Sequence, residues 1–177
     1  MSRSGYTDDW DYGDNWSTIM WRGAVKSSIK GKRGQAFLRE LLAALDSMPD
    51  KRLIASAAQK DGCMCTLGVV AAARGLSLDD LNSSMEGWEW DRIADDLGIA
   101  EAMAREIMEL NDEHTDEFEW VPRPEGPPTP EEWHAFERSY SYRLSDDIRR
   151  PILDAPARRW RFMRDWVAKQ VGAEVLT

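Results

Sequence analysis

Residues 34–49, GQAFLRELLAALDSMP, carry the clearest structural signal in the chain. Their apolar side chains recur at intervals of three and four residues and form one stripe: Phe37, Leu38, Leu41, Leu42, Leu45 and Met48. Such a stripe predicts an amphipathic α-helix with one face in a core. Pro49 ends this helix, because proline lacks the backbone N–H that a helix interior requires. The sequence GKRG at 31–34 predicts a junction with an earlier helix, since glycine is unfavourable within helices and common at their ends.

The same periodicity extends the helical prediction over most of the chain. We expect further helices at 16–29, 67–73, 88–97, 100–111 and 156–171, and one that begins at the capping sequence Thr129-Pro130-Glu131-Glu132. Asp61-Gly62 is a turn dipeptide between two short apolar runs, which predicts a short β-hairpin near residues 53–66. The fold class is therefore mainly α, a compact helical domain of five to seven helices.

Composition divides the chain into four regions. These are a flexible acidic tail at 1–15, a helical core at 16–113, a Pro-rich acidic linker with one helix at 114–156, and a C-terminal helix packing on the core at 157–177. Residues 77–87 and 112–130 are expected to be linkers or surface loops without secondary structure.

For two of the predicted helices, the sequence indicates which side chains face the core. In the helix at 16–29, the apolar face is formed by Trp16, Ile19, Met20, Gly23 and Ala24. In the last helix, the side chains expected to point inward are Trp160, Met163, Val167 and Val171. The arginines of that helix are expected to point mostly outward: Arg158, Arg159, Arg161 and Arg164.

The charges of the chain are segregated along its length. The whole chain has 32 acidic and 23 basic side chains, a net charge of -9. Residues 21–60 hold nine basic and three acidic side chains, net +6, whereas residues 61–120 hold three basic and 16 acidic ones, net -13. Such blocks attract partners of opposite charge. No apolar run approaches the roughly 18 residues of a membrane span, and two cysteines are too few for a disulfide scaffold, so we expect a cytoplasmic protein with no membrane partner.

An acidic, aromatic surface is the first candidate site. Tryptophan is enriched where proteins bind one another, and an acidic surface suits a basic protein partner. The candidate contact residues are Glu86, Trp88, Glu89, Trp90, Asp91 and Trp120. The alternative is that these tryptophans pack loops onto the core.

A basic stretch is the second candidate, as a site for nucleic acid. It consists of Arg22, Lys26, Lys30, Lys32 and Arg33. Phosphate binding there would be sensitive to salt, and a solvated basic face is the alternative. The segment at 93–99 looks like the first helix and turn of a helix-turn-helix. Its second helix carries Glu101, Glu106 and Glu109 against Arg105, so we expect this pair of helices to be structural.

The sequence also contains candidates for catalysis and metal binding. Cys63 and Cys65 have one residue between them, which is not the spacing of a structural zinc pair. Cys65 paired with His114 or His134 could form a nucleophile and base, and a small buried Cys65 is the alternative. The acidic side chains that could hold Mg²⁺ or Ca²⁺ are Asp95, Asp96, Asp112, Glu113, Asp116 and Glu117. We predict no catalytic residue, cofactor or metal, and treat a small enzyme using Cys65 or the acidic cluster as the third function.

Four segments resemble a group of small uncharacterised proteins from tailed phages and prophages. They are WRGAVKSSIKGKRGQAFLRELLAALDSMPDKRLIA at 21–55, CTLGVVAAARG at 65–75, DDLGIAEAMAREIMELNDE at 95–113 and RRWRFMRDWVAKQ at 158–170. The resemblance implies expression in a bacterial host cell and transfers no activity. Accessory phage proteins often bind host machinery, including defence systems. We therefore predict non-enzymatic binding to a host protein, as an inhibitor, with nucleic-acid binding as the alternative.

Overall fold

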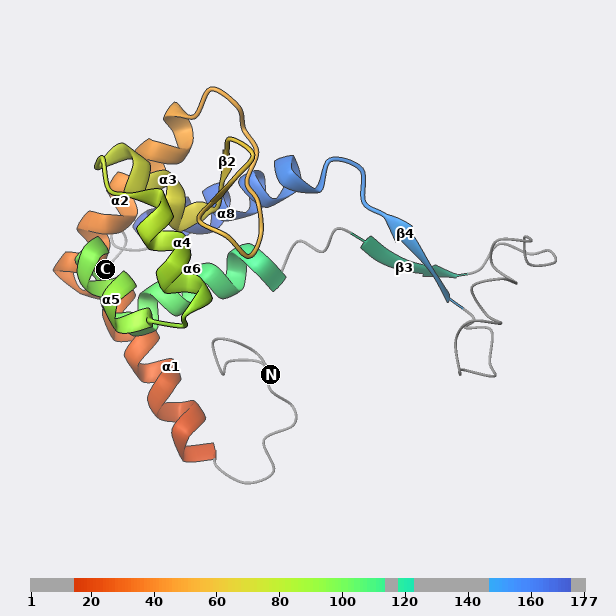
Figure 1. Cartoon of the computed structure of the whole chain (residues 1–177). Helices are drawn as coiled ribbons and strands as arrows, with labels where there is room; N and C mark the ends of the chain where they lie inside the picture. The colour runs from red at the N-terminus through yellow and green to blue at the C-terminus, as the bar shows by residue number, and fades with distance from the viewer. Residues whose placement is uncertain (1–14, 114–117, 123–146, 173–177) are drawn as a thin grey trace. The chain divides into compact units, whose positions relative to one another are not determined.

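The computed structural model describes residues 15–113, 118–122 and 147–172. Over these residues it contains seven helices and two small antiparallel sheets. The chain forms two units, one of residues 1–115 and 154–177 and the other of 116–153. The helices, all in the first unit, are α1 (Asn15–Lys30), α2 (Lys32–Ser47), α3 (Thr66–Ala73), α4 (Leu78–Glu86), α5 (Trp90–Leu97), α6 (Glu101–Glu113) and α8 (Ala155–Gly172). This confirms the predicted fold class (Figure 1).

Helix α2 buries the stripe predicted from its sequence, and it packs against α8, α3 and α1. Phe37, Leu38, Leu41 and Leu45 are at most 2% exposed. Gly34 in its first turn lies where α1 and α2 approach closely, because a Cβ there would fall 1.9 Å from the backbone oxygen of Ser28. Gly34, the second glycine of GKRG, is therefore needed for the packing of these two helices.

Helix α6 lies at the centre of the first unit and contacts α1, α3, α5 and α8. Asn111 near its end is fully buried and organises the chain around it. Its Oδ1 accepts hydrogen bonds from the backbone N–H and the hydroxyl of Thr66, at 3.1 and 2.7 Å, and its Nδ2 donates to the carbonyl of Ile54 at 2.9 Å. One amide thus joins α6, the start of α3 and the segment before the hairpin.

The predicted hairpin is confirmed as β1 (Gln59–Lys60) paired with β2 (Cys63–Met64). Asp61 and Gly62 form its turn with φ of 52° and 79°, the left-handed values that a two-residue hairpin turn requires. Cys65 follows directly and is the N-cap of α3, where its Sγ accepts a hydrogen bond from the N–H of Gly68.

The outward orientation expected for the arginines of α8 is wrong for Arg159, which is 2% exposed. Its Nε donates to the carbonyl of Asn111 and its Nη1 to that of Leu53, both at 2.9 Å. These two bonds join α8 to the end of α6 and to the segment that precedes the hairpin. Met163 and Val167 of the same helix are fully buried, as expected.

The apolar face expected for α1 is also wrong. Ile19 and Met20 are 56% and 57% exposed, and Gly23 and Ala24 are exposed too. The helix instead buries Val25 and Ile29, while its N-terminal part extends away from the other helices (Figure 1). A helical period identifies an apolar face, but it does not determine which face a neighbouring helix covers.

Two predicted linkers contain secondary structure. Residues 77–87 include α4, and residues 112–130 include the end of α6 and strand β3 (Phe118–Pro122), which pairs antiparallel with β4 (Asp147–Pro151) in the second unit. Residues 1–14 of the predicted tail and the helix predicted from Thr129 lie outside the described residues.

Candidate protein-binding site

The turn between α4 and α5 presents a tryptophan in an unusual backbone conformation. Trp88 has φ of 60°, in the left-handed region, and is 59% exposed. The N–H of Trp88 donates to the carbonyl of Met85 at 3.2 Å, and the N–H of Glu89 donates to that of Ser84 at 2.9 Å. This is the bonding pattern of a Schellman motif, in which the position taken by Trp88 is usually glycine.

The left-handed conformation costs roughly 1–2 kcal/mol for a residue with a Cβ. Gly87 is adjacent and has φ of -77°, so the one glycine of the turn does not occupy the left-handed position. Strained residues of this kind cluster at binding and active sites. The conformation of Trp88 therefore marks this turn as a candidate site.

A pocket of about 230 Å³ lies beside Trp88. The residues lining it are Ser56, Met85, Glu86, Trp88, Trp90 and Met108. Trp90 and Met108 are 7% and 1% exposed, so they form part of the core as well as the pocket wall. Methionine side chains adapt their shape to a partner, and Glu86 adds an exposed carboxylate. The pocket thus suits an apolar side chain next to a positive charge.

The structure brings together three of the predicted contact residues, Glu86, Trp88 and Trp90, around this pocket. Glu89 and Asp91 are exposed in the same turn and in the first turn of α5. Trp120 lies in β3, in the other unit. We name the surface formed by Glu86, Trp88, Glu89 and Asp91 with the adjoining pocket the Trp88 surface.

Sequence reasoning missed three residues of the pocket, Ser56, Met85 and Met108. They come from three separate segments, and no motif links them. Ser56 also has a left-handed backbone, with φ of 63°, and its N–H donates to Oδ1 of Asp112 at 2.9 Å. Met85 is next to Glu86 in the sequence, whereas only the fold places Ser56 and Met108 beside Trp88.

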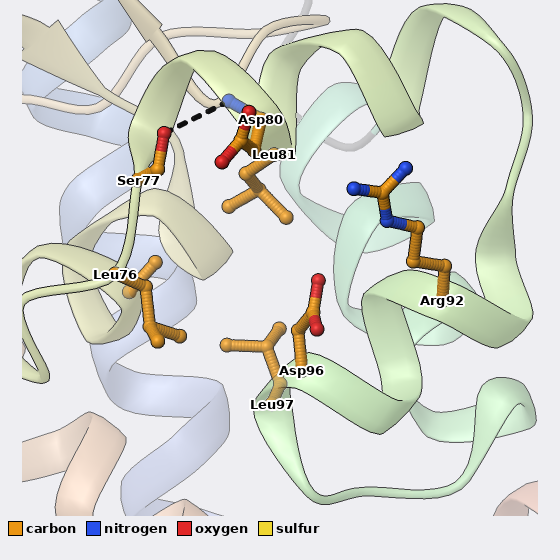
Figure 2. Close-up of a pocket in the computed structure, with 8 residues that line it drawn as sticks. Leu76, Ser77, Asp80, Leu81, Arg92, Asp96 and Leu97 are labelled. Atoms are coloured by element: carbon orange, nitrogen blue, oxygen red, sulfur yellow. Dashed lines mark hydrogen bonds between the residues drawn. The ribbon is translucent and has the colours of Figure 1, made fainter.

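A second pocket of about 190 Å³ lies between α4, α5 and the end of α3 (Figure 2). It is lined by Ala71, Leu76, Ser77, Asp80, Leu81, Arg92, Asp96 and Leu97. The hydroxyl of Ser77 accepts a hydrogen bond from the N–H of Asp80 at 3.2 Å and so caps the first turn of α4. Glu86, Trp88, Glu89, Trp90 and Asp91 do not line this pocket.

The five basic candidates lie at the junction of α1 and α2, and all are exposed: Arg22, Lys26, Lys30, Lys32 and Arg33. The helix is interrupted at Gly31, so Lys26 and Lys30 share α1 whereas Arg33 belongs to the first turn of α2. A continuous helix through Gly31, which would place Arg33 on one face with those lysines, does not form.

Helices α5 and α6, whose sequence resembles a helix-turn-helix, have a structural role, as expected. Gly98 turns the chain between α5 and α6 with φ of 62°. Helix α6 buries most of its residues, including Met103, Ile107 and Met108, which are at most 1% exposed. A helix that is enclosed in this way cannot insert into a DNA groove.

Cys65 is unsuited to act as a nucleophile. It is fully buried, and burial raises the pKa of its thiol to about 12. A thiol must lose its proton to attack a substrate or bind a metal. His114, His134, Asp116 and Glu117 lie outside the described residues. Over the described ranges, no three His, Cys, Asp or Glu side chains gather as metal ligands.

Glu106 of α6 is a buried acid with an unusual titration. It is 8% exposed, and its Oε2 has no hydrogen-bond partner. Burial, reinforced by the charge of Glu109, raises the pKa of Glu106 from 4.5 to about 7. The folded chain therefore holds a proton that the unfolded chain has released, and stability falls as pH rises from about 4.5 to 7.

We expect the Glu106→Gln variant to lose this pH dependence. Above pH 7 it should exceed the wild type in free energy of unfolding by about 1–3 kcal/mol, and the difference should shrink toward pH 5. Urea denaturation at several pH values measures this. Glu101→Gln, on the exposed face of the same helix, is the control and should keep the wild-type pH dependence. Equal stabilities of wild type and Glu106→Gln at pH 8 would contradict the assignment.

Over the ranges that the structure describes, no helix has both the length and the apolar character needed to span a lipid bilayer. Comparisons of the chain with protein-family models, curated proteins and solved structures found no match.

Proposed function

We propose that this chain binds a protein partner through the Trp88 surface and catalyses no reaction. The observation that carries the proposal is the exposed Trp88, held in a strained left-handed conformation beside a pocket of about 230 Å³. Tryptophan anchors are among the side chains that contribute most to protein–protein binding. The strained backbone of Trp88 supports the proposal because such conformations cluster at binding sites.

The charges around Trp88 support a basic partner. Glu86, Glu89 and Asp91 are all exposed. Glu89 is paired with Arg92 at 3.2 Å, and its side chain is 49% exposed in that pair, so its carboxylate remains accessible to a partner. A basic surface with a protruding apolar side chain complements this arrangement. A cation beside Trp88 would gain a further attraction from the ring.

The proposed setting is the cytoplasm of a bacterial host, where the chain acts as a phage or prophage accessory protein. The partner is then a host protein, and the chain inhibits it. The resemblance to phage and prophage proteins at 21–55, 65–75, 95–113 and 158–170 supports this setting. The acidic block at 61–120, net -13, supports binding to a basic protein.

Charge reversal tests the contact surface. We expect the triple variant Glu86→Lys, Glu89→Lys and Asp91→Lys to weaken binding about 10- to 100-fold at low salt, because repulsion replaces attraction to a basic partner. The measurement is affinity capture from bacterial lysate followed by a binding titration with the captured protein.

A second triple variant, Asp50→Lys, Asp61→Lys and Asp165→Lys, is the control. It changes the net charge by the same amount at exposed positions outside the Trp88 surface. The proposal requires this control to bind at near wild-type affinity. An equal loss of affinity in both triple variants would show that net charge alone drives binding. Wild-type affinity in both variants would show that the Trp88 surface is not the contact.

A further inference from the structure

The second pocket combines acidic and apolar walls on the same two helices that carry the Trp88 surface. Asp80 and Leu81 of α4 point into it from one side, and Asp96 of α5 points into it from the other (Figure 2). Leu97 and the 37% exposed Leu76 complete an apolar border. A ligand for this space needs an apolar body and a positively charged end.

The two carboxylates of the pocket have no partner among the side chains that the structure describes. Within the described part of the chain, neither Asp80 nor Asp96 accepts a side-chain hydrogen bond or forms an ion pair, whereas Arg92 at the pocket edge pairs with Glu89. The pocket therefore offers two carboxylates to a cation, and its own guanidinium is engaged elsewhere. A cationic occupant would complement these two carboxylates.

The arrangement favours an ammonium over a guanidinium. A guanidinium binds best when one carboxylate accepts two parallel hydrogen bonds, whereas an ammonium directs three donors to separate acceptors. Asp80 and Asp96 face the pocket from different helices and offer separate acceptors. The four-carbon stem of a lysine would lie against the leucines, as such stems do on apolar surfaces.

We propose that this pocket binds a lysine side chain of the protein partner, with the stem against Leu76, Leu81 and Leu97 and the ammonium between Asp80 and Asp96. The inference rests on the proposed function, since the lysine belongs to the partner that the Trp88 surface binds. It adds a second contact and a chemical requirement, an accessible lysine on that partner.

The test is an NMR titration of the full chain with Nα-acetyl-lysine-N-methylamide. We expect saturable shifts of the amide signals of Ser77, Leu81 and Leu97, with a dissociation constant on the order of 1–10 mM. The norleucine analogue, which has the stem without the ammonium, should produce no saturable shift. Asp80→Asn and Asp96→Asn should each weaken binding by up to about fivefold, the upper range for an exposed ion pair.

Asp95→Asn is the matched control, because Asp95 is exposed on α5 next to Asp96 and does not line the pocket. It should leave lysine binding unchanged. Equal binding of the norleucine analogue, or no effect of Asp80→Asn and Asp96→Asn, would overturn the proposal. Binding of the lysine compound that emerges only in Arg92→Gln would also overturn it, since Arg92 would then occupy the pocket itself.

Failure of this inference is distinguishable from failure of the proposed function. If the lysine compound does not bind while partner binding still depends on Trp88, the pocket assignment fails and the proposed function stands. If the lysine compound binds at the pocket but no protein binds through Trp88, the proposed function fails. The proposal that a partner protein supplies the lysine then fails as well.

Discussion

Replacing Arg159 with methionine will destabilise the folded chain by about 3–5 kcal/mol. Arg159 is 2% exposed and donates to the backbone carbonyls of Asn111 and Leu53. Methionine keeps much of the volume but donates no hydrogen bond, so two carbonyls lose a donor. A buried polar group left without a partner costs about 1–3 kcal/mol, more when the lost partner is charged.

The neighbouring Arg158→Met is the control, because Arg158 is exposed on the same helix. Its effect should stay within about 0.5 kcal/mol. Urea denaturation followed by circular dichroism measures both variants. If the two substitutions lower the free energy of unfolding equally, Arg159 does not join α8 to α6 in the way described.

The sequence predicted where most helices lie, because their apolar side chains follow the helical period. It could not predict the role of Arg159. Four arginines lie close together at the start of α8, and the partners of Arg159 are backbone carbonyls at Leu53 and Asn111, 106 and 48 residues away. Backbone partners leave no mark in the composition, so only the folded chain separates this arginine from its neighbours.

Helix α4 shows a signal that could have been used. Ser77 precedes Asp80 by three residues, which is the spacing of a capping sequence, and Leu78, Leu81 and Met85 follow the helical period. Its polar composition led to the linker prediction instead. Strands β3 and β4 were harder to predict, because they pair across residues 123–146 and each ends in a proline.

The candidate site was predictable in its residues and not in its geometry. Sequence reasoning selected Trp88 and Trp90 together, although the first is 59% exposed and the second 7%. The difference arises because Trp88 takes the left-handed position of the turn, whereas Trp90 begins α5 and is buried in the core. Neither tryptophan's sequence neighbours reveal that distinction.

Trp88→Gly is expected to separate binding from stability. Glycine adopts the left-handed conformation without strain. The free energy of unfolding should therefore differ from the wild-type value by no more than about 1 kcal/mol. The loss of a central tryptophan should weaken partner binding at least about 30-fold, which corresponds to about 2 kcal/mol. A substitution that leaves the fold intact and removes binding would assign the strain to function.

Asp61→Gly is the matched control, since Asp61 is exposed, has φ of 52°, lies in the hairpin turn and is not part of the Trp88 surface. It makes the same kind of backbone change without altering the Trp88 surface, and should bind as the wild type does.

The dissociation constant of the purified partner for wild type, Trp88→Gly and Asp61→Gly tests the central claim most directly. We predict a loss of at least about 30-fold for Trp88→Gly alone, with all three chains equally folded. Equal affinity of Trp88→Gly and wild type would contradict the claim that this chain binds its partner through Trp88.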